Sequence, residues 1–124
     1  MSMSRRVYTT TMYVNEKEIA VKDIEWNDQQ HNITIGGMIV NLTATEYRLL
    51  FPLRHGKPVT YADLAWMAYQ YRVDEKVRIM MDKHIDRIRG KLRGTGIYVY
   101  CVLGYGYMLL SETDSRETNN PRYA

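Results

Sequence analysis

The stretch from residue 75 to residue 93 carries apolar residues at a helical period, and this feature constrains the fold most. At about 100° per residue, five apolar side chains fall within one narrow sector of a helix: Val77, Met81, Ile85, Ile88 and Leu92. An amphipathic stripe of this kind is typical of a helix that packs one side against a core. The sequence therefore predicts a long surface helix over residues 75 to 93.

The charged residues of the same stretch divide into two groups. From Lys76 to Arg93 there are seven Lys or Arg against two Asp, a net +5 in a chain whose total is +3. Nearly opposite the apolar stripe lie four cations together with a methionine and a histidine: Lys76, Met80, Lys83, His84, Arg87 and Lys91. Asp82 and Asp86 lie in a third sector among arginines, where opposite charges can pair. One basic face is thus predicted to remain unneutralised.

The first third of the chain has the composition of β-strands. Residues 7–14, 18–26, 31–35 and 38–42 are rich in Val, Ile, Thr and Tyr and are separated by short turns. Connections this short cannot cross over to make parallel pairs, so we expect an antiparallel sheet of four short strands.

Two helix starts follow the strands. Thr43 is a predicted N-cap with Glu46 three residues later, able to reach back to the cap, and Thr60 repeats the device with Asp63. Pro52 should kink the first helix or end it early. After the long third helix, two strand-like runs at residues 97–103 and 107–110 flank a glycine turn, which predicts a β-hairpin with Tyr105 at its tip.

Composition excludes several classes of protein. No apolar run approaches 18 residues, the start of the chain has no secretory h-region, and Cys101 is a single cysteine; together these favour a cytoplasmic protein. No combination of His, Cys and acidic residues has metal-ligand spacing, so we expect no metal and no cofactor. The glycines of the hairpin do not precede a helix, as a phosphate-binding loop requires, and we expect no enzymatic activity.

The order of strands, three helices and a hairpin is that of an α+β winged helix-turn-helix. From residue 24 to residue 110 the chain resembles the effector domain of the OmpR/PhoB-type bacterial response regulators, whose recurring pattern is LT-x-x-E-[FY]-x-LL, then VDVHI-x-x-LR-x-KL, then TVRG-x-GY. The matching positions are Leu42, Thr43, Glu46, Tyr47, Leu49, Leu50, Asp82, His84, Ile85, Arg89, Lys91, Leu92, Gly104, Gly106 and Tyr107.

The resemblance implies a function and a set of contact residues. It predicts a sequence-specific double-stranded DNA-binding regulator of transcription whose third helix reads the major groove, monomeric in solution and pairing head to tail on DNA. The expected DNA-binding residues are Lys76, Met80, Lys83, His84, Arg87, Lys91 and Tyr105, with Arg87 reading a base and Lys91 holding phosphate. The alternative is a winged-helix module that docks RNA polymerase or a separate regulator and binds DNA weakly or not at all.

Three departures from the family pattern carry further expectations. Leu103 stands where the family commonly places the wing arginine that enters a minor groove, and Lys83 stands where it has an aliphatic residue. No receiver domain precedes the effector region, so no aspartyl-phosphate control is expected. The predicted organisation is a flexible arm at residues 1–6, the DNA-binding domain at residues 7–110 and a disordered polar tail at residues 111–124.

Overall fold

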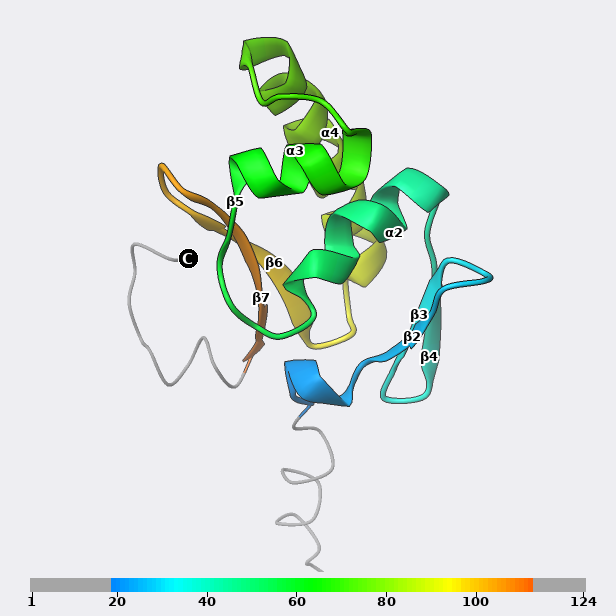
Figure 1. The fold of residues 1–124 in the computed structure, drawn as a ribbon. Coiled ribbons are helices and arrows are strands. Elements are labelled where there is room, and N and C mark those ends of the chain that lie inside the picture. The colour runs from blue at the N-terminus through cyan, green and yellow to red at the C-terminus, as the bar shows by residue number, and fades with distance from the viewer. Residues whose placement is uncertain (1–18, 113–124) are drawn as a thin grey trace, which may run out of the picture.

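The computed structural model describes residues 19–112, which form three α-helices and two antiparallel sheets (Figure 1). The predicted arm, the strand predicted at residues 7–14 and all but the first two residues of the predicted tail lie outside this range. The mixed α+β class and the three helices are confirmed. None of the helices in the described range is both long and apolar enough to cross a bilayer.

The first sheet contains three strands in the order β2-β3-β4, namely Glu25–Asn27, Asn32–Ile35 and Met38–Asn41. The prediction of one strand over residues 18–26 is wrong in its first part. There, residues Val21–Asp23 form a 3-10 helix, η1, because the Asp23 carboxylate accepts a hydrogen bond from the Ala20 amide at 3.2 Å and closes the turn. The strand signal of this segment is realised only from Glu25 onward.

The predicted helix starts are confirmed. Helix α2 spans Ala44–Leu50, and Thr43 and Glu46 exchange the two bonds of a capping box at 3.0 and 2.9 Å. Pro52 falls in a short 3-10 helix, η2 (Phe51–Leu53), which ends α2 early. Helix α3 spans Tyr61–Tyr69 with Thr60 as its N-cap, which accepts from the Asp63 amide at 3.1 Å. The Asp63 side chain does not return a bond to the Thr60 amide, so the second half of the predicted device is wrong.

Helix α4, the longest of the three, spans Glu75–Leu92. It begins at Asp74, whose side chain accepts from the Val77 amide at 2.8 Å. Helices α2 and α3 both pack against α4, so the three helices enclose one core with the sheets (Figure 1).

The second sheet contains the predicted hairpin and one strand more. Strands β6 (Ile97–Val102) and β7 (Gly106–Ser111) form the wing, and β7 also pairs with the short strand β5 (Val59–Thr60), in the order β5-β7-β6. Gly106 is required at this junction, because a Cβ atom there would lie 1.8 Å from the carbonyl oxygen of Val59. Strand β7 extends to Ser111, which is buried.

Candidate nucleic-acid interface

Helix α4 is held against the domain by its apolar stripe, as predicted. All five stripe residues are buried: Val77, Met81, Ile85, Ile88 and Leu92. Complete burial of side chains of this size contributes about 1.5–3 kcal/mol each relative to exposure. The stripe therefore fixes which face of α4 is turned outward.

Three of the predicted contact residues lie on the outward side of α4 with their charges free. Lys76, Lys83 and Arg87 are exposed, and within residues 19–112 none of them makes an ion pair or a side-chain hydrogen bond. They follow one another at intervals of seven and four residues, so they form a row along the helix. We call Lys76, Lys83 and Arg87 the basic row.

The charge of Lys91, in contrast, is neutralised by an acidic partner. The prediction that Lys91 belongs to an unneutralised face is therefore wrong. Its Nζ lies 2.6 Å from Oε1 of Glu46, whose side chain is 2% exposed. Burial by itself raises the pKa of Glu46, but Lys91 and the two Thr43 bonds outweigh it and hold that pKa below its ordinary value. The capping-box glutamate of α2 thus accepts from the end of α4 as well, a contact between residues 45 positions apart that helix periodicity cannot reveal.

His84 is held by a residue of another helix. The Nδ1 of His84 lies 2.8 Å from the Tyr69 hydroxyl on α3. Burial, and then the nearby Arg87, lower the pKa of His84, while burial raises the pKa of Tyr69 to about 12. Met80 is half-buried. Within the described range no group of His, Cys, Asp and Glu could hold a metal ion.

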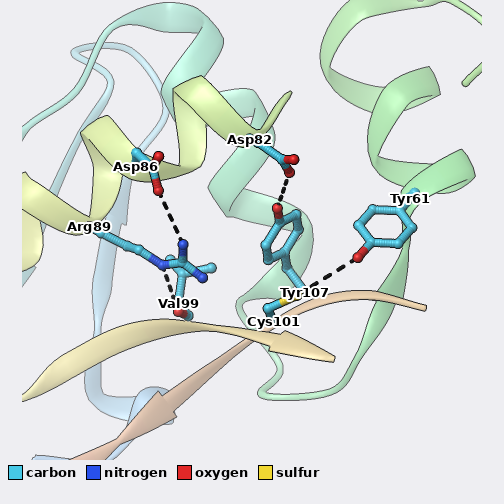
Figure 2. Close-up of polar contacts among 7 residues, drawn as sticks. All are labelled: Tyr61, Asp82, Asp86, Arg89, Val99, Cys101 and Tyr107. Atoms are coloured by element: carbon cyan, nitrogen blue, oxygen red, sulfur yellow. Dashed lines mark hydrogen bonds and ion pairs between the residues drawn. The ribbon is translucent and has the colours of Figure 1, made fainter. Parts of the chain in front are cut away.

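The opposite flank of α4 faces the wing and is tied to it by polar contacts (Figure 2). The Tyr107 hydroxyl of β7 donates to Asp82. Arg89 pairs with Asp86 at 3.2 Å and donates through Nε to the Val99 carbonyl of β6 at 3.1 Å. The predicted pairing of opposite charges is therefore confirmed for Asp86, whereas Asp82 takes a tyrosine from the wing instead of an arginine.

A third wing contact involves α3. The Tyr61 hydroxyl lies 3.8 Å from Sγ of Cys101 (Figure 2), and the guanidinium of Arg78 covers the Tyr61 ring at 3.5 Å. Burial, and then the contact with Cys101, raise the pKa of Tyr61. The guanidinium of Arg78 therefore stacks on Tyr61 and is not free on the outward face of α4, although Arg78 lies within the basic stretch.

Two outward residues of α4 were missed by the sequence reasoning, which looked for charge. Ile79 is 52% exposed, and Gly90 is exposed with open space where a Cβ would stand. Both lie between the basic row and the flank that carries Asp82 and Asp86. The helical wheel already placed Ile79 outside the apolar stripe, and that was the available signal.

Tyr105 lies on the wing and not on α4. It lies at the tip of the wing and is half-exposed, and its carbonyl accepts from the Tyr61 amide at 2.9 Å. Its side chain lines a depression of about 690 Å³ together with residues of α2, η2, β5 and α3, with no residue of α4 among the lining. Leu103, the other prominent side chain of the tip, is 94% exposed.

The chain was compared with known proteins. No family model matches it, and no curated protein matches it significantly. Solved structures of other proteins, however, are similar to this chain. The DNA-binding domain of CpxR from E. coli has 24% identity and a TM-score of 0.60, with 73% of this chain and 92% of that chain covered.

Two further solved DNA-binding domains are also similar to this chain. The DNA-binding domain of AdeR, solved in complex with an intercistronic region, has 29% identity and a TM-score of 0.58 over 72% of this chain and 95% of that one. The DNA-binding domain of Bacillus subtilis CssR has 22% identity and a TM-score of 0.54 over 71% and 100%. In its fold, this chain is a winged helix-turn-helix domain of the kind found in the OmpR/PhoB-type response-regulator effectors.

Proposed function

We propose that this domain is a sequence-specific double-stranded DNA-binding regulator of transcription, and that α4 enters the major groove. The observation that carries the proposal is the basic row. Lys76, Lys83 and Arg87 are exposed along one side of a helix whose other side is buried, and no acidic side chain of the described chain neutralises them. A major groove about 12 Å wide admits a helix presented in this way.

The members of the basic row differ in the contacts that their side chains can make. Arg87 has the planar fork that pairs with guanine, and Lys76 and Lys83 supply charge on the preceding turns. The partners that the structure gives Lys91 and His84 favour a supporting role for both, in which they fix α4 against α2 and α3. Met80 and Tyr105 remain predicted contacts at the margin of the interface.

The AdeR domain, which was solved with a DNA intercistronic region, supports a duplex as the partner. We further propose that the domain is a monomer in solution and pairs head to tail on direct repeats. Sedimentation without DNA is expected to give a monomer at micromolar concentration. A tight dimer under those conditions would contradict this part of the proposal.

The proposal is tested by selecting bound sequences from a random duplex pool and then measuring salt dependence. With Arg87 on a base, Lys76 and Lys83 on phosphate give α4 a share of about −2 in the slope of log affinity against log salt for each bound domain. Lys83→Ala should reduce the slope by about one. Lys22→Ala, an exposed lysine on η1, is the matched control and should leave it unchanged. A slope near zero would remove nucleic acid as the main partner.

A second function has one observation in its favour. Large apolar side chains on α3 and the turn after it are exposed, namely Trp66, Met67 and Tyr71. Such a patch is typical of protein contacts, and it fits a module that docks RNA polymerase or another regulator. A domain that binds no duplex at low salt, yet alters transcription in a way that Trp66→Ala abolishes, would select this function over the first.

A further inference from the structure

Ile79 is an apolar side chain within a charged surface. It is the fifth residue of α4, three residues after Lys76 and four residues before Lys83, so it lies next to both free cations, at the edge of the basic row. It is 52% exposed and does not belong to the core cluster of buried residues. Core packing therefore does not account for an isoleucine at this position.

The Ile79 side chain is also conformationally restricted, which suits a residue that recognises a ligand. Isoleucine is branched at Cβ, and in a helix it occupies one strongly preferred χ1 rotamer. Its methyl groups are therefore already oriented before any ligand arrives, and little side-chain entropy is lost when they make a contact. A flexible lysine at the same place would lose up to about 2 kcal/mol of rotamer freedom.

The surroundings of Ile79 determine which part of a duplex can approach it. Ile79 lines a shallow depression of about 550 Å³ together with three acidic residues, Asp74, Glu75 and Asp82. The one cation of this depression, Arg78, is stacked on the Tyr61 ring. Carboxylates at this position repel phosphate, which favours the edge of a base over the DNA backbone as the neighbour of Ile79 on this side.

We propose that Ile79 is a specificity-determining residue that contacts the C5-methyl group of a thymine. In the major groove this methyl is the one apolar group that a base pair presents, and it distinguishes T·A and A·T from both G·C pairs. The N-terminal part of a recognition helix is the part that reaches base edges in helix-turn-helix proteins. This inference rests on the proposed function and adds a base preference to it.

The test removes only the methyl group. Duplexes that carry the selected site are made with deoxyuridine in place of thymidine, one position at a time, and titrated with the wild-type domain and with Ile79→Ala. Loss of one buried methyl corresponds to about a fourfold loss of affinity. The wild type should show this loss at one thymine, and Ile79→Ala should bind the two duplexes equally.

Two further variants complete the design. Ile79→Val keeps a branched side chain and should retain discrimination, whereas Ile39→Ala, which removes an exposed isoleucine from β4, should behave as wild type. Ile79→Ala should remain folded, because it lies outside the core and alanine favours helix. Equal effects of each deoxyuridine on wild type and Ile79→Ala would overturn the inference while duplex binding stands. Absence of binding to any duplex would instead overturn the proposed function.

Discussion

The contact between Lys91 and Glu46 allows the most direct test of how α4 is held. Glu46 is 2% exposed and Lys91 is 38% exposed, with 2.6 Å between Nζ and Oε1. Breaking a fully buried ion pair costs about 3–5 kcal/mol, and a fully exposed pair contributes about 0–1 kcal/mol. Here solvent screens the lysine, and the Thr43 amide still donates to Glu46 after the lysine is removed. We therefore expect Lys91→Ala to lower the free energy of unfolding by about 1–2 kcal/mol.

The assay is urea unfolding followed by circular dichroism, with thermal unfolding as a second measurement. For a domain of this size, a loss of 1–2 kcal/mol corresponds to a fall in Tm of about 5–15 °C. Lys83→Ala removes a cation of the same helix that has no partner within the described residues, and it should stay within about 0.5 kcal/mol of wild type. Equal unfolding midpoints for Lys91→Ala and Lys83→Ala would refute the reasoning.

A double-mutant cycle isolates the contact itself. Glu46→Gln keeps a side-chain oxygen that can accept from the Thr43 amide but removes the charge that Lys91 meets. Combined with Lys91→Ala, it should show a coupling of about 1 kcal/mol rather than additivity within about 0.5 kcal/mol. In DNA titrations of folded protein, Lys91→Ala should also leave the salt slope unchanged. A slope whose magnitude falls by about one would instead indicate that Lys91 contacts phosphate.

Three further outcomes are expected. Gly106→Ala should destabilise the domain by more than about 3 kcal/mol, because the new Cβ meets the Val59 carbonyl. Gly90→Ala adds a Cβ that meets nothing within 4 Å and should stabilise α4 by about 0.5–1 kcal/mol. Urea unfolding compares the two variants. The pKa of Glu46 is lowered on folding, so its contribution to stability is complete above its ordinary pKa of 4.5 and is lost as pH falls through the folded pKa. Acid titration of stability should therefore be flatter for Glu46→Gln, and an unchanged profile would contradict this. Leu103→Arg should strengthen binding to sites flanked by A-tracts, measured against mixed-sequence flanks at fixed salt, and equal affinities would argue against a wing that reaches the minor groove.

The sequence by itself determined the helices and the orientation of α4. Caps act through residues three positions apart, and the apolar stripe repeats every turn, so Thr43, Thr60 and the buried side of α4 could be identified without a structure. The same local rules failed over residues 18–26, where strand propensity alone does not register the turn that Asp23 closes.

Only the tertiary structure decided which charges of α4 remain available. The helical period groups Lys91 with Lys83 and Arg87, but Lys91 pairs with Glu46 of α2, and His84 bonds to Tyr69 of α3. On the other flank, Asp82 meets Tyr107 of the wing. These partners come from segments far apart in the chain, and no periodicity within one helix encodes what packs beside it. The exposed cations of the predicted face that have no partner in the described chain are therefore fewer than the sequence indicated, namely Lys76, Lys83 and Arg87, and the outward side of α4 also carries the apolar Ile79.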